Sequence, residues 1–264
     1  MALKVPLRKR RQVELGEDGL VRMSLVDHLA ELRRRVMIST IAVALGGVVG
    51  FLLYNRVLAF LQAPYCDLKR EKGLAPDSFA GNCNFVITDP LEGVTTRFKV
   101  SAYIGLALAL PIVLWQLWRF ITPGLHPKEK KYAIPFIVSS VLLFALGALI
   151  AVITFPNALD FLISVSGDEV ETLFGPAKYI SLYTLIMLAF GVAFEFPVVL
   201  VFLQVAGVLT PKKLLGAWRF AIVGIFVVAA VITPSQDPYS LAGMALPMTS
   251  FYFISIRIGK LLGK

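Results

Sequence analysis

The sequence is poor in the side chains that build metal centres and active sites. Its 264 residues include only two histidines, His28 and His126, and two cysteines, Cys66 and Cys83. Their positions do not match the spacing of zinc or haem ligands, so we expect no metal site and no cofactor. A glycine-rich phosphate loop and a nucleophile elbow are also missing, and the apolar segments hold no Ser/His pair. These absences argue against an enzyme.

Charged residues are scarce as well, at 16% of the chain, whereas 57% of the residues are hydrophobic and the mean hydropathy is +0.76. This composition is typical of an integral membrane protein. We predict an all-α membrane protein whose six transmembrane helices cover about residues 36–54, 100–118, 133–155, 180–205, 218–232 and 239–256. Because no internal repeat or low-complexity segment divides the chain, we predict one transmembrane domain, 23–264, after a basic cytoplasmic arm, 1–22.

The basic residues predict the orientation. Most of the 26 Lys and Arg residues flank the predicted spans on the side that also carries both termini. By the positive-inside rule this side is cytoplasmic. The net charge of +9 is therefore a signal of topology, and we expect the lipid bilayer rather than nucleic acid as the partner of these charges.

A helical pattern begins at Ser24, which opens a capping box that Asp27 completes. Apolar residues then recur at helical spacing, which predicts an amphipathic interfacial helix leading into the first span. Glu31 lies on the polar side of this helix. It has a structural alternative, because a pair with Arg35 one turn later would stabilise the helix by only about 0.3 to 0.5 kcal/mol.

Glu195 is the only charged residue between positions 180 and 205. An acid inside the hydrocarbon costs about 2.5 to 3.5 kcal/mol on insertion scales, so we expect a partner or a task for it. Pro197 removes a backbone donor two residues later, which predicts a kink beside this carboxylate.

Two further acids are candidates with simpler alternatives. Glu129 is the one acid in the basic loop at 119–132, and it could instead stabilise the first turn of the third helix after Pro127. Asp237 follows the fifth span, and it could serve only as a turn former and helix cap. Glu31 and Glu129 lie on separate segments, so each could bind one guanidinium of a paired arginine bidentately. This pattern favours cationic peptides as ligands.

The last two spans form a short hairpin. Thirteen residues separate Arg219 from Thr233, which as a helix gives about 20 Å against a hydrocarbon core of about 30 Å. We expect the bilayer to thin, or neighbouring helices to tilt, beside this pair.

Cys66 and Cys83 fall in the first outer loop, where an oxidising compartment permits a disulfide. We predict this bridge, which the chain-entropy model credits with about 3 kcal/mol. A pair of free thiols is the alternative.

Several motifs together resemble the TatC family, the polytopic receptor subunit of the twin-arginine protein translocase. They are DHLAELRRR at 27–35, Ala63-Pro64, WRFITPGL at 118–125 with Glu129, FGVAFEFP at 190–197, and Thr233-Pro234 with Asp237.

The resemblance implies a cup-shaped arrangement of six helices in the bacterial cytoplasmic membrane, multi-pass, with both termini cytoplasmic. It also implies a receptor for the Arg-Arg signal peptides of folded precursors, working in an oligomeric complex with TatA/TatB-type single-span partners. Export would draw on the proton motive force. By the resemblance, Glu31 and Glu129 contact the arginine pair, Arg33 and Phe120 shape the site, and Glu195 and Asp237 contact the partners.

A proton-coupled secondary transporter that uses Glu195 as its proton carrier is the alternative. The missing repeat and the lack of a second intramembrane charge count against it. A membrane-embedded hydrolase would need a nucleophile and base pair that the chain does not offer.

Overall fold

The structure, a computed structural model, describes residues 25–71, 89–121, 133–165, 175–233 and 237–263. Within these ranges every regular element is a helix and no strand occurs. The predicted arm, 1–22, lies outside them. The helices are α1 (Leu25–Glu71), α2 (Glu92–Ile121), α3 (Ala133–Val165), α4 (Pro176–Ala193), α5 (Phe196–Val205), α6 (Pro211–Gly216), α7 (Trp218–Ile232) and α8 (Pro238–Leu261).

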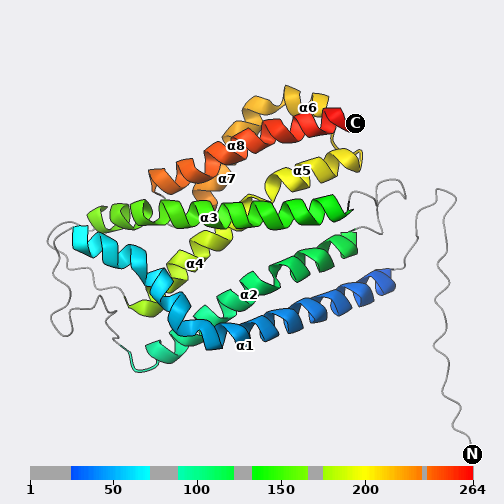
Figure 1. Ribbon diagram of the computed structural model, residues 1–264. Coiled ribbons are helices and arrows are strands. Elements are labelled where there is room, and N and C mark those ends of the chain that lie inside the picture. The colour runs from blue at the N-terminus through cyan, green and yellow to red at the C-terminus, as the bar shows by residue number, and fades with distance from the viewer. Residues whose placement is uncertain (1–24, 72–88, 122–132, 166–174, 234–236, 264) are drawn as a thin grey trace, which may run out of the picture.

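The six predicted spans are confirmed. Five segments are long and apolar enough to cross a membrane, with α4 and α5 together forming one of them, and α7 is a shorter sixth apolar helix. The start of α1 and the end of α8 lie at the same end of the bundle, as six crossings require (Figure 1). We call this the Glu31 end, and the opposite end, where α2 begins, the Glu92 end.

The first helix is longer than predicted. The amphipathic start, the first span and the beginning of the expected outer loop form one helix of 47 residues, which includes Pro64. Figure 1 shows that α1 bends on its way toward α3. Contacts from elsewhere in the chain support the extension, because Leu61 and Tyr65 are buried and the Tyr179 hydroxyl donates to the Leu61 carbonyl at 2.8 Å.

Small residues let α1 and α2 approach closely. A Cβ atom added at Gly46 would lie 2.8 Å from the carbonyl oxygen of Gly105, and one added at Gly50 would lie 2.7 Å from that of Ser101. Such spacing of glycines is common where membrane helices meet. The glycines of the first span therefore serve internal packing.

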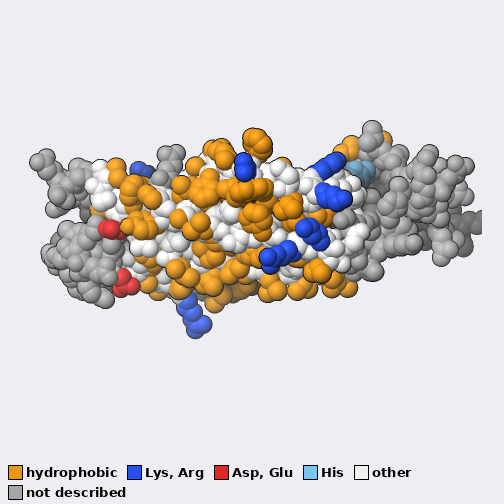
Figure 2. Space-filling view, turned by 90° about the horizontal axis from the view of Figure 1, so that it is seen from above, with side chains coloured by type: hydrophobic (Ala, Val, Ile, Leu, Met, Phe, Trp, Pro, Cys, Tyr) orange, Lys and Arg blue, Asp and Glu red, His pale blue; other side chains and the backbone are white. Residues whose placement is uncertain are grey.

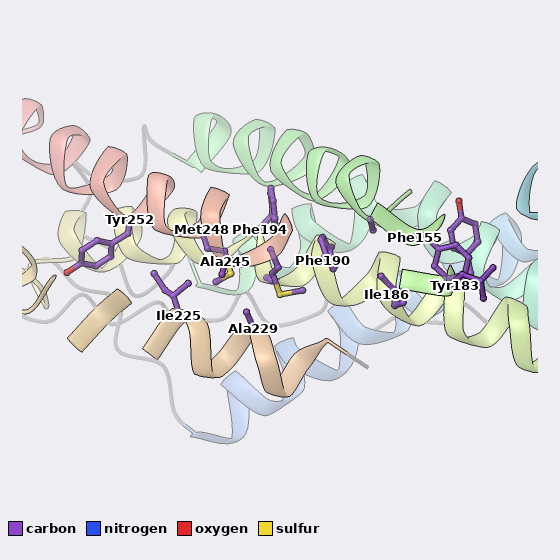
Figure 3. Packing of buried hydrophobic residues seen from close by; sticks show 14 of the residues in the cluster. Phe155, Tyr183, Ile186, Phe190, Phe194, Ile225, Ala229, Ala245, Met248 and Tyr252 are labelled. Carbon is purple, nitrogen blue, oxygen red and sulfur yellow. The ribbon is translucent and has the colours of Figure 1, made fainter. Parts of the chain in front are cut away.

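A second packed region joins the C-terminal helices to α4. Phe190 and Phe194 meet Ala245 and Met248 of α8, while α7 contributes Ile225 and Ala229 (Figure 3). These six side chains are all buried. Burial of this kind holds the short α7 against the longer helices.

The fifth span is short, as predicted, but the sixth is not. At 15 residues α7 reaches about 22 Å, whereas the 24 residues of α8 reach about 36 Å. The helix of α8 continues beyond the predicted apolar segment as far as Leu261. Figure 2 shows apolar side chains across the face of α6 to α8, with most visible Lys and Arg toward the Glu31 end.

Candidate functional site

The first turns of α1 meet the last turns of α2 at the Glu31 end. Glu31 forms an ion pair with Arg35, one helical turn later on the same face. The Arg35 Nε atom donates to Glu31 Oε1 at 3.1 Å, and Nη1 donates to Gln116 Oε1 of α2 at 3.3 Å. Arg35 thus connects the predicted ligand-binding carboxylate to the neighbouring helix.

The two oxygens of Glu31 are in different situations. Arg35 Nε and Nη2 both donate to Oε1, whereas Oε2 is buried and has no hydrogen-bond partner in the described ranges. Both side chains are largely shielded, at 15% exposure for Arg35 and 19% for Glu31. Bidentate binding by an incoming guanidinium therefore requires Arg35 to move, and Oε2, although unpaired among the described residues, must first be uncovered.

Phe120 also lies at the Glu31 end, and its ring stacks on the ring of His28 of α1. The ring centroids are 4.3 Å apart and the planes differ by 21°. Sequence reasoning assigned Phe120 to the site but gave no role to His28, Arg35 or Gln116. The spacing of His28 and Glu31 at i and i+3 was a usable signal, because it places both on one helical face.

The remaining predicted ligand residues are placed differently. Arg33 is exposed, and its two-residue offset from Glu31 turns it to the opposite side of α1. Glu129 lies at 122–132, outside the described residues. The structure therefore brings Glu31 and Phe120 together but does not bring Arg33 to them.

Glu195 lies at the break between α4 and α5. The chain turns there over two residues, Phe194 and Glu195, and the Glu195 amide donates to the Val192 carbonyl at 3.1 Å. Pro197 occupies the start of α5, where a missing N–H costs little. The predicted kink is thus a helix break with the acid at its corner.

The carboxylate of Glu195 has one internal partner. The Ser140 hydroxyl of α3 interacts with it, and Ser140 in turn accepts a hydrogen bond from Trp118 Nε1 of α2 at 3.3 Å. The other oxygen, Oε1, is buried and lacks a hydrogen-bond partner among the described residues. Neither Ser140 nor Trp118 was singled out for this role, because nothing in their sequence spacing links them to Glu195.

Asp237 caps α8 from a buried position. Its Oδ1 accepts from the Ser240 amide at 2.7 Å, and its side chain has 0% exposure. Asp237 therefore acts as the N-cap of α8, which was the simpler of its two possible roles. Its contact with a partner protein stays a prediction.

Cys66 is disulfide-bonded, and no cysteine in the structure is free. Cys83, the only other cysteine of the sequence, lies outside the described residues.

No group of three potential metal ligands occurs in the ranges that the structure covers. The polar chemistry available is therefore hydrogen bonding and ion pairing by isolated carboxylates. Such groups suit the recognition of cationic or hydrogen-bonding partners.

Comparisons with known proteins agree with this architecture. Residues 27–247 match the family model described as Sec-independent protein translocase protein (TatC). The TatC protein of Frankia casuarinae is 38% identical over 250 residues, covering 94% of this chain and 68% of that protein. The TatC of Aquifex aeolicus is 38% identical over 242 residues, covering 90% of this chain and 95% of that one.

A crystal structure titled as the twin-arginine translocase receptor TatC superposes with a TM-score of 0.68. Its sequence is 37% identical, and the match covers 90% of this chain and 100% of that one. The helical bundle, the matched residues and the shared length thus agree, and the chain belongs to the TatC family of Sec-independent protein translocase proteins.

Proposed function

We propose that this translocase subunit is a receptor that binds the paired arginines of signal peptides at the Glu31 end. The observation that carries the proposal is the buried Oε2 of Glu31, which has no hydrogen-bond partner among the described residues and lies one helical turn from His28, the residue that stacks on Phe120. A buried carboxylate oxygen without a donor favours a ligand that brings one. An arginine brings several donors and a planar surface that stacks on aromatic rings.

The second contact for the arginine pair is proposed at Glu129. This residue follows the end of α2 by eight positions, and α2 carries both Phe120 and Gln116. Two carboxylates on separate segments select for two guanidinium groups. A twin-lysine peptide offers no planar fork and should bind less well.

The distribution of charge also bears on the orientation of the protein in the membrane and on its partners. The excess of Lys and Arg at the Glu31 end supports a cytoplasmic location for this end and for both termini, in the bacterial inner membrane. Single-span TatA/TatB-type proteins are the proposed partners, with Glu195 as one contact, because its buried Oε1 has no hydrogen-bond partner among the described residues. Proton-gradient-driven export of folded precursors is the process we infer for the assembled complex.

Photo-crosslinking tests the receptor proposal. A signal peptide with a photo-reactive group beside its Arg-Arg pair should label the full-length chain in membranes, and Glu31→Gln should reduce the labelling strongly. Glu92→Gln is the matched control, because it makes the same chemical change at the opposite end of the bundle, where Glu92 accepts from the Ala177 amide at the start of α4. Undiminished labelling of the Glu31→Gln protein would contradict the proposed site.

A further inference from the structure

A cavity opens near the Glu92 end, between the far part of α1, α3 and α4. Its volume is about 330 Å³. The lining consists of Phe60, Ala63, Pro64, Asp67, Val152, Pro156 and Tyr183, of which only Asp67 and Tyr183 carry polar side-chain atoms. Phe60 and Ala63 are exposed, so the cavity can be entered from the side of the bundle that faces lipid.

Tyr183 is the unusual member of this lining. Its side chain has 0% exposure, yet its hydroxyl has no hydrogen-bond partner in the part of the chain that is described. The other two fully buried tyrosines are satisfied: Tyr179 donates to Leu61 O at 2.8 Å and Tyr252 donates to Leu214 O at 2.6 Å. A buried donor without an acceptor is rare in native proteins and calls for an explanation. Here the unsatisfied tyrosine is the one that lines a cavity.

Water is a poor occupant for this space. An ordered buried water needs two to four polar partners, and apolar cavities stay dry. The cavity has room for several water molecules, while only Asp67 and Tyr183 of its lining carry polar side-chain atoms, which is the minimum for one ordered water. A hydrocarbon chain that carries one hydrogen-bond acceptor matches this lining better.

The position of Tyr183 along the bundle indicates which part of a lipid could lie next to it. Tyr183 lies seven residues from the start of α4, or about 10 Å along the helix. The 33 residues of α3 span about 50 Å, whereas the hydrocarbon core is about 30 Å thick. If α3 is centred in the bilayer, each of its ends extends about 10 Å beyond the core. Tyr183 therefore lies near the boundary between hydrocarbon and headgroups, where the acyl esters of phospholipids are found.

We propose that this cavity binds a diacyl phospholipid of the adjacent leaflet, with an ester carbonyl oxygen accepting a hydrogen bond from the Tyr183 hydroxyl. One acyl chain lies against the apolar lining contributed by α1 and α3. The bound lipid fills the space between the extended part of α1 and the α3–α4 pair.

The test compares a diacyl phosphatidylethanolamine with its dialkyl ether analogue, which lacks the ester carbonyls. Lipid retention by the purified full-length protein is measured by native mass spectrometry. We expect the wild-type protein to retain the diacyl lipid about fivefold more tightly, as one neutral hydrogen bond allows. Tyr183→Phe should bind both lipids equally, at the level of the ether lipid.

Tyr179→Phe is the matched control, because it removes a hydroxyl that is already bonded and does not line the cavity. This variant should keep the preference for the ester. Ala63→Leu, which narrows the cavity without touching Tyr183, should lower retention of both lipids, and it tests the site even if Tyr183→Phe folds poorly. The proposal is overturned if the wild-type protein does not distinguish the two lipids, or if Ala63→Leu retains both as the wild type does.

Discussion

Arg35 donates to one oxygen of the Glu31 carboxylate, and the other oxygen has no hydrogen-bond partner among the described residues. The guanidinium bonds to Oε1 and to Gln116, while Oε2 is buried without a partner among the described residues. The proposed receptor therefore contains its own guanidinium in the place that an arginine ligand would take. Arg35 acts as an internal competitor that limits the ligand to one oxygen of this carboxylate.

Removing this competitor should strengthen peptide binding. In Arg35→Gln both Glu31 oxygens become available and the carboxylate loses its neutralising charge, while the amide can still bond to Gln116. We expect the affinity for an Arg-Arg peptide to rise about fivefold, which is less than one charged hydrogen bond allows. Fluorescence anisotropy with a labelled peptide measures the change.

Arg34→Gln is the control for this experiment, because it lowers the net charge equally at an exposed position. It should leave the affinity unchanged or reduce it slightly. An Arg35→Gln protein that binds more weakly than the wild type would show that Arg35 orients Glu31 rather than competing for it.

The Glu195 carboxylate should matter for assembly more than for peptide binding. Glu195→Ala removes the carboxylate with its unpaired Oε1. We therefore expect weaker co-purification of a single-span partner, with little change in the affinity for the peptide. Ser140→Ala keeps the carboxylate but removes its internal partner, which is also the acceptor for Trp118 Nε1, and it should preserve the association. Equal loss of peptide binding and partner binding in Glu195→Ala would contradict this separation of roles.

Close packing of α1 on α2 makes Gly105 sensitive to substitution. A Cβ atom at this position would lie 2.6 Å from both Val43 O and Gly47 N, which are backbone atoms that cannot rotate away. Gly105→Ala should lower the free energy of unfolding by about 1 to 3 kcal/mol. Gly216→Ala is the control, since nothing lies within 4 Å of its added Cβ. Thermal denaturation in detergent should separate the two variants, and equal melting temperatures would contradict the close approach.

Sequence reasoning succeeded where the cause was local. Pro197 follows Glu195 by two residues and breaks the helix there, and the thirteen residues between Arg219 and Thr233 limit α7 directly. Each of these features depends on residues within a few positions of one another.

The failures concern contacts between distant segments. The extension of α1 depends on Tyr179, which bonds to Leu61 from 118 positions away. The bond from Ser140 to Glu195 has no sequence signature either, so the acid's internal partner could not be anticipated. By contrast, the outward position of Arg33 follows from its two-residue offset from Glu31, and helical geometry alone could have shown it.

Two substitutions at Asp237 can distinguish its role as a helix cap from a role in binding a partner protein. Asp237→Ala removes the cap from the α8 amides and should cost about 0.5 to 2 kcal/mol of stability. Asp237→Asn keeps an oxygen that accepts from Ser240 and should retain most of that stability. If the residue only caps, Asp237→Asn should also assemble normally with a single-span partner in co-purification. If the charge itself contacts a partner, Asp237→Asn should stay stable yet lose the association, because the amide keeps the hydrogen bond but not the charge.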